Sequence, residues 1–142
     1  MVRFPFRYED TIHSNVHLVP TVPIQSCSSI VNKNDLGGSV ALIERGECSF
    51  VTKAINAQEV GVIGAIIMDN DKDNKQAVID MLDDQTTRNV KIPVMFITYD
   101  DGHMILQSIK RNNFIGALIN IPLNLSHTDV FKARKAPWSY WL

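Results

Sequence analysis

The run SVALIERGECSF, residues 39–50, places a short apolar segment, a tight turn and a helix start next to one another. Val40–Ile43 is uniformly apolar, which is typical of a strand covered on both faces. Gly46 permits a turn that most residues would resist. Ser49 can cap a helix by accepting a hydrogen bond from an amide of its first turn. The run therefore predicts a strand followed directly by a helix.

A second apolar strand is predicted after this helix, over residues 62–68. Gly61 suits a left-handed cap at the end of the helix, whose core-facing residues recur at helical spacing: Phe50, Ala54 and Ala57. Two apolar strands joined by a short helix are most simply parallel neighbours with a right-handed crossover. We expect Gly64, inside the second strand, to allow close approach of a helix.

Several more strands are indicated on either side of this unit. Residues 16–19, 92–97 and 114–122 are apolar runs that predict strands. The polar run at 69–75 predicts a solvated turn, and residues 77–82 predict a short strand or a helical turn.

A second main helix is expected between the strands at 92–97 and 114–122. Asp100 or Asp101 can cap it, and it extends to about Asn112. Its predicted buried face consists of four apolar residues: Met104, Ile105, Leu106 and Ile109. The sum is an α/β domain with a mixed β-sheet and two main helices.

The composition limits the number of domains and the kinds of partner. The chain has 142 residues and 45% hydrophobic content, which predicts one domain, residues 1–142, with a real core. A net charge of −1 argues against binding nucleic acid through a basic surface. The longest apolar run, Val60–Met68, is too short to insert across a membrane. The first residues show no apolar leader, so we expect either a cytosolic protein or a mature, truncated or engineered chain.

The order and spacing of these segments resemble the protease-associated (PA) domain family. The residues that carry the resemblance are RGECSF at 45–50, Gly61, VIGAIIMDN at 62–70 and IPV at 92–94. The resemblance covers roughly residues 16–122 and leaves an extension at 1–15 and a tail at 123–142. It implies a β/β/α sandwich or open barrel. It also implies a non-catalytic module that binds proteins or peptides in the secretory pathway or outside the cell.

The chain has two cysteines, Cys27 and Cys48, and their spacing alone leaves a disulfide and free thiols equally open. The resemblance implies that they pair, in a loop of about 20 residues. The alternative is a small cysteine-dependent hydrolase or redox enzyme centred on Cys48. In that case the helix start would lower the thiol pKa, and His103 or another histidine would act as base.

No metal, cofactor or catalytic residue is expected. His13 and His17 are four residues apart, but their surroundings indicate strand or loop, where the two rings would not share a helix face. The acidic run that starts at Asp69 and continues with Asp71 and Asp73 lacks the glycine, the closing glutamate and the preceding helix of a calcium loop.

Three further sets of residues are candidate sites. Arg45, Gly46 and Ser49 form a possible interaction surface, because free amides at a helix start favour a carboxylate or acidic group. Asn124 opens an N-glycosylation triplet, Asn-Leu-Ser. The aromatic tail carries Trp138, Tyr140 and Trp141, which either pack across the sheet and stabilise the fold or bind a partner.

Overall fold

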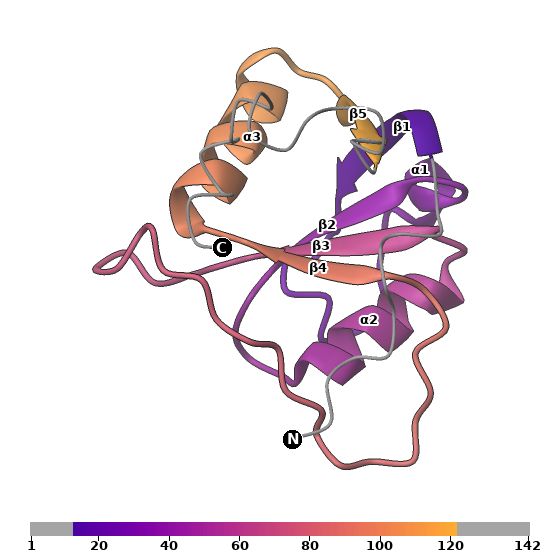
Figure 1. Cartoon of the computed structure of the whole chain (residues 1–142). Coiled ribbons are helices and arrows are strands. Elements are labelled where there is room, and N and C mark those ends of the chain that lie inside the picture. Colours follow the sequence, from indigo (N-terminus) through magenta and orange to yellow (C-terminus); the bar gives the residue numbers. More distant parts are fainter. Residues whose placement is uncertain (1–12, 122–142) are drawn as a thin grey trace, which may run out of the picture.

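The computed structural model describes residues 13–121, which form one five-stranded sheet with helices on both faces (Figure 1). The strand order is β4-β3-β2-β1-β5. The first four strands are parallel to their neighbours, and β5 runs antiparallel to β1. The strands are β1 (His13–Pro20), β2 (Val40–Glu44), β3 (Gly64–Met68), β4 (Val94–Ile97) and β5 (Ala117–Ile121).

Three helices accompany the sheet: α1 (Lys33–Leu36), α2 (Phe50–Glu59) and α3 (Tyr99–Arg111). In Figure 1, α2 and α3 lie on opposite faces of the sheet. The α/β class, the mixed sheet and the two main helices are confirmed. The short helix α1 was not predicted, because it has four residues and one buried side chain, Leu36, and so shows no periodicity.

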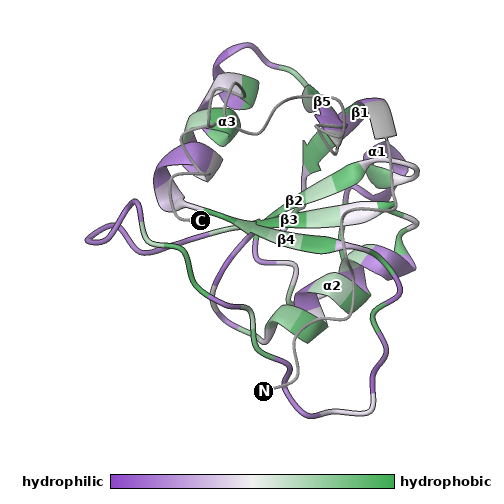
Figure 2. Ribbon diagram, in the orientation of Figure 1, coloured by the Kyte–Doolittle hydropathy of each residue, from purple (hydrophilic) through white to green (hydrophobic). Residues whose placement is uncertain are grey.

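The core lies on both sides of β2 and β3. All five residues of β3 and the first four of β2 are buried, as their uniformly apolar sequences predict. One cluster joins the α2 face of the sheet to Val51, Ala54 and Ala57 of the helix. A second cluster joins the other face to Leu106 of α3. Figure 2 shows the hydrophobic central strands and the hydrophilic loop that follows β3.

Both ends of α2 are as the sequence predicts. The Ser49 hydroxyl accepts a hydrogen bond from the amide of Thr52, at 3.1 Å. Gly61 adopts a φ of +85°, and its amide donates to the carbonyl of Gln58. The parallel pairing of β2 and β3 around this helix is also confirmed.

The start of α3 differs from the prediction. Thr98, and neither Asp100 nor Asp101, caps the helix. Its hydroxyl accepts from the Asp101 amide at 3.2 Å and donates to the Asp101 carboxylate at 2.9 Å. Met104 is 63% exposed and does not belong to the buried face, because it lies on the far side of the helix from Leu106 and Ile109.

Other local predictions also need correction. The strands near residues 62, 92 and 114 begin later than predicted, at Gly64, Val94 and Ala117. The nearest neighbours of Gly64 are Pro93, just before β4, and Val40 of β2, so its close approach is to these segments and not to a helix. Residues 77–82 form neither a helix nor an extended strand.

The boundaries of the domain stay a prediction. Residues 1–12 and 122–142 are outside the described part of the chain, and with them lie Asn124, Trp138, Tyr140 and Trp141. Within residues 13–121, no helix is long and apolar enough to cross a membrane.

Candidate interaction site

The turn after β2 is the centre of the candidate site. It lies where the carboxyl ends of the parallel strands meet, the edge at which ligands usually bind in open α/β sheets. Gly46 has a φ of +112°, and a Cβ at this position would lie 2.9 Å from the side-chain nitrogen of Asn70. The turn therefore requires glycine both for its backbone conformation and for the close approach of the β3–β4 loop.

A disulfide between Cys27 and Cys48 links this turn to the loop that follows β1. The two Cα atoms are 5.8 Å apart. The pairing expected from the family resemblance is therefore present in the structure. As one half of this bond, Cys48 has no thiol that could act as the nucleophile of the alternative enzyme.

Lys53 of α2 links the same two segments without a covalent bond. The side chain is completely buried. Its Nζ donates hydrogen bonds to the carbonyls of Gly46, at 2.5 Å, and Gln25, at 2.7 Å, and lies 3.5 Å from the Cys27 sulfur. Burial lowers the pKa of Lys53 to about 8, while the negative charges of Glu44 and Glu47 oppose this shift.

Sequence reasoning missed Lys53, although one signal could have found it. Lys53 is three residues after Phe50 and four before Ala57, on the apolar stripe of α2. A lysine on such a stripe must either extend to solvent or find acceptors inside. Here the two turns on either side of the disulfide provide carbonyl oxygens.

Arg45 provides the positive group of the site that remains accessible. Its side chain is 37% exposed, and one guanidinium nitrogen lies 2.9 Å from Oδ1 of Asp69, which is 1% exposed. Oδ1 also accepts from the amides of Asn70 and Asp71. The other carboxylate oxygen of Asp69 has no hydrogen-bond partner among residues 13–121. The carboxylate thus holds Arg45 in place, while most of the N–H donors of Arg45 stay unused by this pair.

Ser49 is less available to bind a partner than the sequence suggests. Besides capping α2, its hydroxyl donates to the carboxylate of Asp84 at 2.6 Å. The hydrogen bonds from Ser49 and Thr86 hold the pKa of Asp84 well below its usual range, and the charge of Arg88 adds to the effect. An acidic group already lies beside the start of α2, so Arg45 is the better placed partner for an incoming carboxylate.

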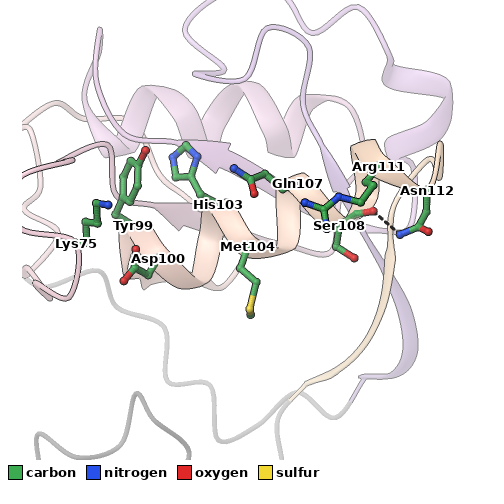
Figure 3. A pocket seen from close by; sticks show the side chains of 9 residues that line it. All are labelled: Lys75, Tyr99, Asp100, His103, Met104, Gln107, Ser108, Arg111 and Asn112. Atoms are coloured by element: carbon green, nitrogen blue, oxygen red, sulfur yellow. Dashed lines mark hydrogen bonds between the residues drawn. The ribbon is translucent and has the colours of Figure 1, made fainter.

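A groove along α3 is a second surface feature of the described chain. It has a volume of about 600 Å³ and is lined by polar and aromatic side chains, shown in Figure 3. His103 stacks on Tyr99 with ring centres 4.0 Å apart. The Nε2 atom of His103 lies 3.5 Å from a Glu44 carboxylate oxygen but forms no hydrogen bond. His103 is therefore near the carboxyl edge of the sheet, but it does not meet Cys48 as a catalytic pair.

The structure brings together Arg45, Gly46, Ser49 and the disulfide, but it gathers no metal ligands. In the range 13–121, no group of three or more His, Cys, Asp or Glu side chains is arranged to hold a metal ion. Asp69 and Asp71 instead accept hydrogen bonds from amides of their own loop.

Comparisons with known proteins identify relatives of this chain. The chain is 39% identical to a PRADC1-like protein of Drosophila melanogaster over 128 residues, which cover 89% of this chain and 65% of the relative. It is 31% identical to the human ER degradation-enhancing alpha-mannosidase-like protein 3 over 102 residues, 69% of this chain and 11% of the relative. The chain thus spans about two thirds of the first relative and about a tenth of the second.

A solved structure and a family match complete the comparison. The structure is BSAP, a zinc aminopeptidase from Bacillus subtilis, with a TM-score of 0.45 and 25% identity, covering 66% of this chain and 21% of that one. The sequence pattern of the PA domain matches residues 14–105, which include the turn, the disulfide, Lys53 and the start of α3. The chain belongs to the PA domain family.

Proposed function

We propose that this chain is a non-catalytic module that binds a protein or peptide through the turn after β2. The observation that carries the proposal is that two interactions hold this turn in place. They are the Cys27–Cys48 disulfide and the hydrogen bonds of buried Lys53. A surface that is rigid before binding loses little conformational entropy when a partner docks. Membership of the PA family and the PRADC1-like relative also favour a non-catalytic role.

The chemistry of the turn favours an acidic partner. Arg45 is held by Asp69 but is partly exposed, and a guanidinium can bind a carboxylate through two parallel hydrogen bonds. The exposed side chain of Glu47 lies on the same turn and would repel a second negative group. We therefore expect recognition of one carboxylate, such as an aspartate side chain or a chain terminus, rather than a strongly acidic segment.

Site-specific photo-crosslinking tests the surface. A photoreactive residue at Glu47, exposed on the turn, should capture a partner in conditioned medium, and Arg45→Ala should abolish this product. The same photoreactive residue at Lys110, exposed on α3, serves as the matched control and should give no such product. Equal crosslinking at both positions, or a product that survives Arg45→Ala, would show that the turn is not the binding surface.

The proposed compartment is the secretory lumen or the extracellular space. Disulfides persist in oxidising compartments, and one relative is named as an ER degradation-enhancing protein. If the chain passes through this pathway, Asn124 can carry a glycan. Expression behind a leader in eukaryotic cells should then give a form whose mobility changes with Asn124→Gln. Identical mobility of the two secreted proteins would remove Asn124 as a modified site.

A further inference from the structure

Exposed apolar side chains gather around the start of β5. Three of the eight large apolar side chains that are exposed in residues 13–121 fall within five residues: Phe114 (65%), Ile115 (66%) and Leu118 (62%). Scattered exposed apolar residues are normal, but a cluster indicates a surface that is covered by something. We call Ile115 and Leu118, together with His17, the β5 patch; His17 pairs with Leu118 and borders the same hollow as Ile115.

The β5 patch lies on the α2 face of the sheet, at the β1–β5 end, where the short helix α1 borders it. Val16 and Ile119 are cross-strand partners, and both pack in the cluster under α3. His17 and Leu118 are the next pair and point to the opposite face, because side chains alternate along a strand. On that face α2 packs on the central strands (Figure 1) and α1 contributes Leu36 beside Val19, so within residues 13–121 the side chains of Ile115 and Leu118 stay exposed.

A hollow adjoins the β5 patch. It has a volume of about 350 Å³ and is bounded by His17, Val19, Ile115, Asp35 and the glycines after α1. Its floor is apolar at Val19, which is 2% exposed and belongs to the core cluster on this face. An aromatic side chain inserted here would therefore extend the core.

We propose that the C-terminal segment of this chain, residues 122–142, docks Trp138 and Trp141 on the β5 patch. The segment continues directly from β5, the strand that carries Leu118. Twenty residues separate Leu118 from Trp138, and an extended chain spans roughly 3.3 Å per residue, so the tryptophans can fold back onto the strand. Tryptophan is well suited to such a site because its ring buries a large apolar area.

Charge favours the β5 patch over the groove along α3. The residues just before the tryptophans are basic: Lys132, Arg134 and Lys135. The hollow beside the β5 patch carries Asp35, whereas the α3 groove carries Lys75 with Asp100 towards one end and Arg111 towards the other (Figure 3). Asp35 attracts a basic segment to the hollow, whereas in the groove Lys75 offsets Asp100 and Arg111 adds a second positive charge.

Tryptophan fluorescence tests this docking directly, because Trp138 and Trp141 are the two tryptophans of the entire chain. In the intact protein the emission should be blue-shifted and protected from acrylamide. Leu118→Ser and Ile115→Ser should each shift the emission to the red and increase quenching, while circular dichroism stays unchanged, because both side chains are exposed. Met104→Ser, a matched control on the α3 groove with 63% exposure, should change neither signal.

Three results would overturn the proposal. Emission of the intact protein equal to that of the unfolded chain would show that the tryptophans are not docked. A red shift with Met104→Ser but not with Leu118→Ser would place them on the α3 groove. Emission that changes on dilution would show that a second copy of the chain covers the tryptophans.

Discussion

The turn after β2 and the β1–β5 strand pair both lie at the periphery of the sheet, and they are supported very differently. The turn is held by a disulfide, by two hydrogen bonds from buried Lys53 and by the Arg45–Asp69 ion pair. On the face of β1 and β5 that carries Leu118, the part of the chain that the structure describes provides strand pairing but leaves Ile115 and Leu118 exposed. The first region has its shape fixed before a partner binds, whereas the second exposes apolar side chains that, on our proposal, the C-terminal segment covers.

Of the changes considered, removing the disulfide should lower the stability of the protein the most. Cys27→Ala with Cys48→Ala should lower the free energy of unfolding by about 3 kcal/mol, because the unfolded chain regains the freedom of a loop of about 20 residues. Urea denaturation at neutral pH measures the change. Val31→Ser, an exposed apolar position outside the supported turn, is the control and should stay within about 0.5 kcal/mol of the original protein. Equal stability of the double alanine variant and the original would contradict the role given to the disulfide.

Lys53 should make stability rise in alkaline solution. Its pKa is about 8 in the folded protein against 10.5 when unfolded, so below pH 8 both states hold the proton and the folded state bears the full cost of the buried charge. Between these two values the unfolded chain binds more protons, and stability increases with pH. Relative to Lys53→Met, the original protein should gain roughly 2 to 3 kcal/mol across this window.

The measurement is a series of urea titrations from pH 7.5 to 10.5 on the original protein and Lys53→Met. The exposed lysines are common to both, so the difference between the two profiles isolates Lys53. Parallel profiles would mean that the folded state does not lower the pKa of this lysine.

A methyl group at Gly102 should loosen the contact between α3 and β3. A Cβ at this position would lie 2.2 Å from the Cβ of Met68, so the helix or the strand must move. We expect Gly102→Ala to destabilise the protein by about 2 kcal/mol, the usual cost of overpacking a tight contact. Gly37→Ala is the matched control, since its Cβ would meet nothing within 4 Å. Thermal melting of the two variants checks the prediction, which fails if they melt together.

Ser49→Ala should have the smallest effect on stability, about 1 kcal/mol, because it removes the cap of α2. It also removes the hydrogen bond from Ser49, which is the largest of the effects that lower the pKa of Asp84. Asp84 stabilises the fold above the ordinary carboxyl pKa, and this contribution disappears as the pH falls towards its lower folded value. Between pH 5 and pH 2, Ser49→Ala should therefore lose less stability than the original protein. An NMR titration of Asp84 that is unchanged by Ser49→Ala would refute the link.

The sequence predicted the parts of the fold that depend on local pattern. The apolar runs at β2 and β3, the cap at Ser49 and the glycine at the end of α2 each depend on neighbouring residues, and all were found in the structure. The cap of α3 was misplaced because Thr98, Asp100 and Asp101 are all good capping residues within four positions.

The candidate site was only partly predictable, because its contacts connect distant segments. Arg45, Gly46 and Ser49 are close in sequence and were found together. Lys53 was missed because its acceptors, the carbonyls of Gln25 and Gly46, come from two loops that meet only in the folded chain. The open face of β1 and β5 was missed for the same reason: the exposure of Leu118 depends on which helix covers which strand.

The pairing of β1 with β5 also affects the time course of synthesis on the ribosome. Val16 pairs with Ile119, so β1 gains its second neighbour only about 100 residues after it has been made. At roughly 5 to 20 residues per second, the nascent chain carries β1 as an edge strand for several seconds after β2 and β3 can pair. An unpaired edge can add strands from other chains, so during this interval the chain depends on protection from its surroundings.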